Sequence, residues 1–177
     1  MDIGEALDML RPSAISRSPK NVVRLMWDRL SPLPGGKKLF SRAIGMAAPY
    51  TGPIRAEVVT LKKGFAEVTM ADRPSVRNHL SCVHAVALVN LAEVTGNVAL
   101  AYSLPDEARF IVAGLSIEYL KKARGTLHAS SECPVPETAD RVEYQVPVHI
   151  WNAAGEEVAR ATLRTLVGPK SSRGNGQ

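Results

Sequence analysis

The feature that most constrains the fold of this chain is the apolar run from Val83 to Ala101, which carries a single carboxylate, Glu93. The polar residues of the run, Asn90, Glu93 and Asn97, recur at intervals of three and four, which places them on one line along a helix. A helix this apolar cannot lie on a protein surface, so other elements must cover most of it. We therefore expect one long central helix with an acid on one side.

The segments on either side of this helix have an apolar period of two, which is the period of a β-strand. Two runs before the helix are joined by Lys62-Lys63-Gly64 and predict a hairpin, and four runs follow the helix. In the first of these four, alternation predicts one shared face for Ile111, Ala113, Leu115, Ile117 and Tyr119. The order of elements predicts an α+β fold in which a six-stranded antiparallel sheet wraps around one long central helix.

The N-terminal part of the chain shows a helical pattern instead. Apolar spacing predicts an amphipathic helix within Lys20 to Leu30, and Ser31 to Gly36 ends it. Lys37 to Tyr50 forms a less regular connection with room for another short helix. We expect an N-terminal helical extension over residues 1–50, a single sheet-and-helix domain over 51–168, and a disordered tail over 169–177.

Composition restricts the class of protein but not its partner. An apolar content of 45% and a mean hydropathy of −0.04 are ordinary for a soluble globular chain. Because Met1 to Arg17 lacks a secretory pattern and polar residues interrupt the longest apolar run, we expect a cytoplasmic protein without a membrane span. Cys82 and Cys133 are too few for a disulfide framework. The net charge of +5 favours anionic partners, which include nucleic acid, membrane surfaces and phosphorylated small molecules.

A spaced motif links the start of the central helix to a known family. Asn78 precedes His84 by six positions, and Glu93 follows His84 by nine. With the order of elements, this spacing makes the segment 53–167 resemble the hotdog fold, and in particular its PaaI-like phenylacetyl-coenzyme A thioesterases and a related, mostly uncharacterised branch. The resemblance implies an acyl-coenzyme A thioesterase that needs no resident cofactor and no metal, because coenzyme A arrives as part of the substrate.

A second likeness lies in the basic turn after the first strand of the C-terminal series. The segment 117–125 is similar to the strand and turn that these enzymes place near the coenzyme A phosphates. The resemblance implies that Lys121, Lys122 and Arg124, together with Gly125, receive the phosphates. The alternative is that this is an ordinary solvated turn.

The chain departs from the family pattern directly after His84. These thioesterases usually carry Gly-Gly at this point, whereas this chain has Ala85-Val86. The backbone N–H of Ala85 is still available to an oxyanion, but the Val86 side chain is expected to narrow or reshape the acyl pocket.

The chemistry of thioester hydrolysis assigns a role to each residue of the motif. A helix start offers N–H donors and a positive dipole end, so Ala85 is the expected oxyanion donor. Glu93 is expected to act as general base or as nucleophile, and Asn78 to bind the carbonyl or the water. His84 is expected to orient the loop, and Asn97, one turn beyond Glu93, to help position the acid or the water.

Helix geometry predicts that the site is shared between two subunits. Ala85 and Glu93 are separated by roughly 12 Å along one helix at about 1.5 Å per residue, so one carbonyl cannot meet both. Two antiparallel central helices would bring Glu93 of one copy to Asn78 and Ala85 of the other. We therefore expect a homodimer, with a dimer of dimers left open.

Other interpretations remain open from the sequence. The polar line on the helix could be its one face toward water, and Asn78 could only cap a turn. His79, Cys82 and His84 do not have the spacing of a common zinc site. A hotdog hydratase or dehydratase acting on acyl thioesters is a second enzymatic hypothesis. A non-catalytic acyl-thioester-binding protein is a third. We expect an acyl-coenzyme A ligand and no nucleic acid.

Overall fold

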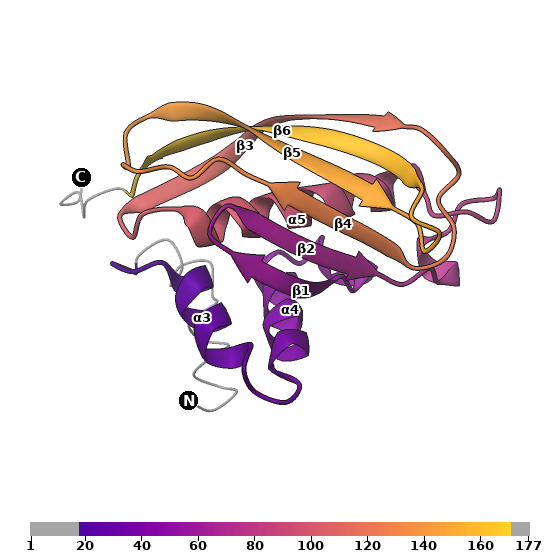
Figure 1. The fold of residues 1–177 in the computed structure, drawn as a ribbon, viewed down its shortest axis with the longest axis horizontal. Coiled ribbons are helices and arrows are strands. Elements are labelled where there is room, and N and C mark those ends of the chain that lie inside the picture. The colour runs from indigo at the N-terminus through magenta and orange to yellow at the C-terminus, as the bar shows by residue number, and fades with distance from the viewer. Residues whose placement is uncertain (1–17, 171–177) are drawn as a thin grey trace, which may run out of the picture.

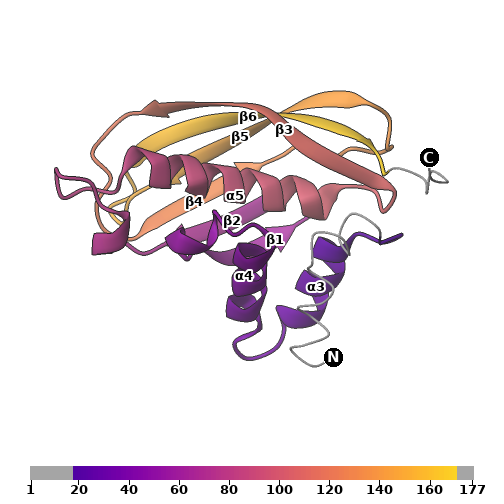
Figure 2. The ribbon, with the colours of Figure 1, turned by 180° about the vertical axis from the view of Figure 1, so that it is seen from behind.

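The computed structural model describes residues 18–170, where a six-stranded antiparallel sheet curves around one long helix (Figure 1). The strands are β1 (Glu57–Lys62), β2 (Phe65–Met70), β3 (Ala108–Tyr119), β4 (Leu127–Glu132), β5 (Val142–Trp151) and β6 (Glu157–Pro169). Their order across the sheet is β1-β2-β4-β5-β6-β3, so β1 and β3 are the edges. Helix α5 (Ala85–Ser103) runs along the inner face, as Figure 2 shows from behind. This confirms the expected α+β hotdog architecture.

Helix α5 contacts all six strands, and Leu91 and Leu100 are fully buried between it and the sheet. By length and composition alone this helix could cross a membrane. Most of it is covered inside the protein, which is the environment of a core helix. The turns expected from the sequence are confirmed, because Gly64 and Gly155 take positive φ angles of 77° and 75° between β1 and β2 and between β5 and β6.

The prediction of one shared face along β3 is wrong. The pairing of β3 with β6 changes register between Val112 and Gly114, so Ala113 is an extra residue and forms a β-bulge. A bulge reverses the alternation beyond it. Ile111 is therefore 67% exposed on the outer face, whereas Leu115 packs against the core.

The N-terminal segment contains two helices, which confirms the predicted helix within residues 20–30 and the second short helix. They are α3 (Val22–Leu30) and α4 (Gly36–Ala47), and two single-turn helices follow, η1 (Gly52–Ile54) and η2 (Pro74–Val76). Both α3 and α4 lie on the side of α5 that the sheet leaves open (Figures 1 and 2). The rings of Trp27 and Phe40 pack edge to face with their centroids 5.1 Å apart, and both residues belong to the same hydrophobic core as the sheet.

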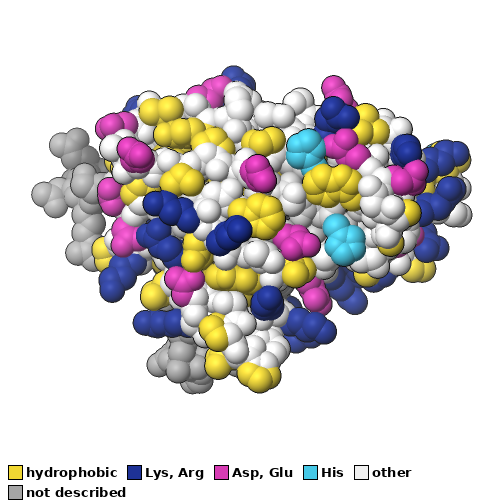
Figure 3. All heavy atoms as spheres, in the orientation of Figure 1, with side chains coloured by type: hydrophobic (Ala, Val, Ile, Leu, Met, Phe, Trp, Pro, Cys, Tyr) yellow, Lys and Arg dark blue, Asp and Glu magenta, His cyan; other side chains and the backbone are white. Residues whose placement is uncertain are grey.

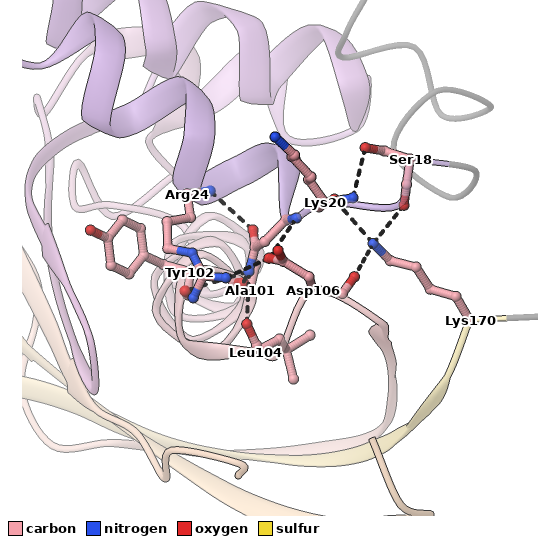
Figure 4. Close-up of polar contacts among 9 residues, drawn as sticks. Ser18, Lys20, Arg24, Ala101, Tyr102, Leu104, Asp106 and Lys170 are labelled. Atoms are coloured by element: carbon pink, nitrogen blue, oxygen red, sulfur yellow. Dashed lines mark hydrogen bonds and ion pairs between the residues drawn. The ribbon is translucent and has the colours of Figure 1, made fainter. Parts of the chain in front are cut away.

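A polar cluster joins the start of α3 to the end of α5 (Figure 4). Asn21 caps α3 and donates its side-chain amide to the carbonyl oxygens of Ala101 and Leu104. The Asp106 carboxylate accepts from the Asn21 backbone N–H at 3.0 Å and from the Arg24 guanidinium at 2.6 Å. The extension is therefore anchored to the domain by buried and partly buried polar contacts as well as by apolar packing. The proposed segment boundaries stay predictions, and residues 171–177 of the expected tail lie outside the described part.

Charges of both signs are interspersed over the outer face of the sheet (Figure 3). The net charge of +5 therefore does not form one continuous basic surface on that side. Such a surface is what binding along a nucleic-acid backbone would require.

Candidate functional site

The start of α5 leaves one backbone donor free. His84 is the N-cap, and its Nδ1 accepts a hydrogen bond from the Val86 N–H at 3.1 Å. The His84 carbonyl accepts from the N–H groups of Ala87 and Leu88. Within residues 18–170 the Ala85 N–H has no hydrogen-bond partner. An oriented donor at the positive end of a 19-residue helix is thus available to an anion.

Asn78 lies beside this helix start on a tight turn. Its Oδ1 accepts from the Leu80 N–H at 2.9 Å and lies 3.3 Å from the Cys82 sulfur, while its own N–H bonds to the Cys82 carbonyl. Asn78 therefore does cap the turn, as the alternative interpretation expected. The same contacts fix the orientation of the amide, and its Nδ2 group has no partner among the described residues.

The basic turn lies next to the Asn78 turn. Arg124 donates to the carbonyl oxygens of Leu80 and Ser81 at 3.4 Å, and the Val83 N–H donates to the Ala123 carbonyl at 2.9 Å. These contacts connect segments that are about forty positions apart in the sequence.

The lysines of the basic turn are exposed. Lys121 pairs with Glu156 at 2.7 Å, and this contact is the main cause that lowers the pKa of Glu156. Lys122 has no partner among residues 18–170. One ammonium group is thus free to meet an anionic ligand, and the other would have to share or exchange its carboxylate partner.

One open hollow of about 330 Å³, the helix-start hollow, brings these groups together. It is lined by Asn78, Cys82, Val83, Ala85, Leu88, Tyr119, Leu120, Lys121, Lys122 and Ala123. Four of the residues selected from the sequence therefore share one surface depression. Arg124 and Gly125 belong to the same turn but do not line it.

Glu93 lies elsewhere. In the single chain its side chain is exposed and does not line the helix-start hollow. It lies on a stripe of α5 that neither the sheet nor the N-terminal helices cover, together with exposed Val86 and half-buried Val89 and Asn97. Asn90, expected on the same line, is instead buried and donates to the Tyr50 carbonyl at 3.0 Å. Of the three polar residues along the helix, Asn90 is therefore buried, Asn97 is half-buried and Glu93 is exposed.

Asn97 is partly enclosed one turn beyond Glu93. Its Oδ1 is buried and has no hydrogen-bond partner in the described part of the chain. A buried acceptor without a partner is costly, and such groups are uncommon in folded proteins.

Val86, the second residue of α5, lines a different hollow from Ala85. Its side chain is 51% exposed and lines a second hollow of about 310 Å³, the Tyr50 hollow, with Tyr50, Ile54 and Asn90. The Val86 side chain therefore lines the Tyr50 hollow and not the helix-start hollow.

Asp72 is a site residue that sequence reasoning did not select. Its carboxylate accepts from the Arg77 guanidinium at 2.7 Å and from the Gly125 N–H at 2.9 Å. The Arg77 contact is the main cause that lowers the pKa of Asp72. The signal available in the sequence was a lone acid directly after a strand, ahead of Arg73, Arg77 and the basic turn.

Comparisons with known proteins place this geometry in context. A family model described as "Domain of unknown function (DUF4442)" matches residues 36–167. No curated protein matches the chain. The crystal structure of the genomics target APC5556 is 32% identical, with a TM-score of 0.72, and the match covers 84% of this chain and 99% of that one.

Two more distant crystal structures share the fold. PA5026 from Pseudomonas aeruginosa, named a protein of unknown function and probable thioesterase, is 18% identical with a TM-score of 0.65 over 77% of this chain and 97% of its own. A hypothetical thioesterase from Streptococcus pneumoniae TIGR4, crystallised with coenzyme A, is 21% identical with a TM-score of 0.59 over 72% and 99%.

Proposed function

This chain belongs to the DUF4442 family, a domain of unknown function, and has the hotdog fold; from this premise we propose that it hydrolyses acyl-coenzyme A thioesters. The observation that carries the proposal is the helix-start hollow. There an Ala85 amide without a partner among residues 18–170, the Asn78 side chain and two lysines surround one space. The fold relatives named as thioesterases, one of them holding coenzyme A, support the same class of ligand.

The hollow supplies groups for two parts of such a substrate. Negative charge develops on the thioester oxygen as the carbonyl is attacked, and the Ala85 N–H and the Asn78 Nδ2 are donors that can stabilise it. Lys122, and Lys121 after exchange with Glu156, provide positive charge for the nucleotide phosphates at the edge of the hollow. His84 keeps the first turn of α5 in place through its cap to Val86.

In this proposal the carboxylate comes from a second copy of the chain. Glu93 is exposed on the open stripe of α5 and is separated from Ala85 of its own helix by roughly 12 Å. Strand β3 is a free edge of 12 residues, and unpaired edges are surfaces on which another sheet can add. Two copies related by a two-fold axis would then form two equal sites. Glu93 acts there as general base or nucleophile, with Asn97 one turn away to position it or the water.

Replacing Glu93 by Gln tests this assignment. We expect Glu93→Gln to slow thiol release from a panel of acyl-coenzyme A substrates at least about 100-fold, because the amide can neither take a proton nor form an anhydride. The matched control is Glu132→Gln, since Glu132 is also exposed but lies at the end of β4 and does not line the helix-start hollow. Hydrolysis that survives in Glu93→Gln would remove Glu93 from the mechanism.

A non-catalytic acyl-thioester-binding protein is the second candidate, and the position of Glu93 outside the helix-start hollow favours it. Wild-type protein that binds an acyl-coenzyme A in calorimetry without releasing thiol would support this candidate against the hydrolase. Hydration of an enoyl thioester in the same panel would instead indicate a hydratase.

A further inference from the structure

We propose that Asp72 is a positioning residue that ties the basic turn, residues 121–125, to the Asn78 turn and so fixes the cations that meet the nucleotide of coenzyme A. This inference rests on the proposed function for the identity of the ligand. The tie itself can be tested without any substrate.

The Asp72 carboxylate is largely covered by the chain around it. Asp72 follows β2, and its side chain is only 7% exposed. A carboxylate covered to this extent normally has partners. Both oxygens are engaged, one by the Arg77 guanidinium and the other by the Gly125 N–H. The carboxylate therefore lies between the two turns and bonds to both.

Gly125, at the far end of the basic turn, donates its N–H to the Asp72 carboxylate. The middle of the turn is held by the Ala123 carbonyl, which accepts from Val83 at 2.9 Å, and Arg124 adds two contacts of 3.4 Å. Gly125 has a φ of 73°, and a Cβ placed on it would meet no atom within 4 Å. A residue in open space with a left-handed backbone needs a partner to hold one conformation, and Asp72 supplies it.

Asp72 also supplies negative charge where the two turns meet. Asp72 is the acid that faces Arg77 directly, and the Arg124 charge is close enough to act on it as well. Without the carboxylate, the Arg77 guanidinium would lose the acid with which it pairs. Arg77 also directly precedes Asn78, so the same carboxylate steadies both halves of the site.

The first experiment measures the tie in the ligand-free protein. Asp72→Asn leaves one acceptor for two donors, so we expect the Gly125 amide to exchange its hydrogen at least about ten times faster. Glu132→Gln is the control and should leave that rate unchanged. An unchanged Gly125 rate in Asp72→Asn would overturn the inference.

The second experiment separates the nucleotide from the rest of the ligand. Calorimetry is expected to show that Asp72→Asn binds coenzyme A about ten times more weakly, while binding of pantetheine, which lacks the nucleotide, changes less than about two-fold. Asp72→Glu, which keeps the charge, should recover part of the coenzyme A affinity. Equal losses for both ligands, or no loss for coenzyme A, would contradict a role at the basic turn.

The outcomes distinguish this inference from the proposed function. Coenzyme A binding without turnover, together with faster Gly125 exchange in Asp72→Asn, would contradict the hydrolase but support the tie. Thioester turnover together with an unchanged hydrogen-exchange rate of the Gly125 amide would support the hydrolase but contradict the tie. If Asp72→Asn does not fold, Asp72→Glu takes its place and should bind coenzyme A more weakly by a smaller factor, with little change in pantetheine binding. If Asp72→Glu weakens both ligands equally, or neither, the inference is overturned.

Discussion

Two capping residues lie near the ends of α5, and one of them also joins segments that are distant in the sequence. His84 and Asn21 are both N-caps, although only Asn21 is of a residue type that helix N-caps favour. In the described part of the chain the His84 ring bonds only within its own helix, whereas the Asn21 amide also bonds to carbonyls at the far end of α5. Asp106 completes that junction by accepting from Arg24 and from Asn21.

The Asp106 contacts predict a pH dependence of stability. The Asn21 N–H, and then Arg24, lower the pKa of Asp106, so the folded protein holds this proton less tightly than the unfolded chain does. The stabilisation is therefore complete above the unfolded pKa and is lost as the pH falls through the folded pKa. Because the side chain is 48% exposed, solvent screens the interaction, and we expect about 1 kcal/mol or less.

The measurement is urea unfolding of wild type and Asp106→Asn between about pH 2 and pH 7. The difference in free energy of unfolding should be constant near neutrality and shrink in acid. A difference that grows as the pH falls would show that Asp106 is not stabilised as a carboxylate.

At the scale of elements, the position of α5 depends on one glycine. A Cβ on Gly96 would lie 3.0 Å from Leu163 and 3.2 Å from Val146, and both side chains are fully buried in the sheet. The helix can thus approach the sheet closely at this turn. No periodicity rule selects Gly96, because the residues that it faces come more than forty positions later.

We expect Gly96→Ala to destabilise the protein despite the higher helix propensity of Ala. The propensity gain is about 1 kcal/mol, whereas overpacking a fixed core costs about 1–3 kcal/mol. The net loss should be on the order of 1 kcal/mol in chemical denaturation. Gly96→Ser, with one more heavy atom, should lose more, and a stabilised Gly96→Ala variant would contradict the close packing.

At the scale of the whole molecule, the open stripe of α5 and the free β3 edge predict an obligate homodimer. Both Val86 and Val89 lie on the stripe with Glu93, and apolar side chains beside an uncovered carboxylate suit an interface between copies. The same association would bring Glu93 to the helix-start hollow.

Val89→Lys is expected to give a monomer in sedimentation and to lose thiol release, since it places a charge at the centre of the proposed interface. Leu33→Lys is the control, because Leu33 is 56% exposed in the connection between α3 and α4. A wild-type monomer that hydrolyses thioesters would rule out the shared site. For a dimer, the apparent melting temperature should also rise with protein concentration.

The sequence by itself determined the elements and four of the ten residues that line the helix-start hollow, because periodicity and turn residues act between near neighbours. Ala85 was selected from the helix start and Asn78, Lys121 and Lys122 through the family resemblance, and these four residues do share one hollow.

Only the tertiary structure decided the features that depend on partners distant in the chain. The bulge at Ala113 turns Ile111 outward, Tyr50 buries Asn90 while Glu93 stays open, and Asp72 acquires its role from Gly125. Each of these results depends on a contact between residues at least forty positions apart, or on the register of two strands, and neither leaves a trace in local spacing.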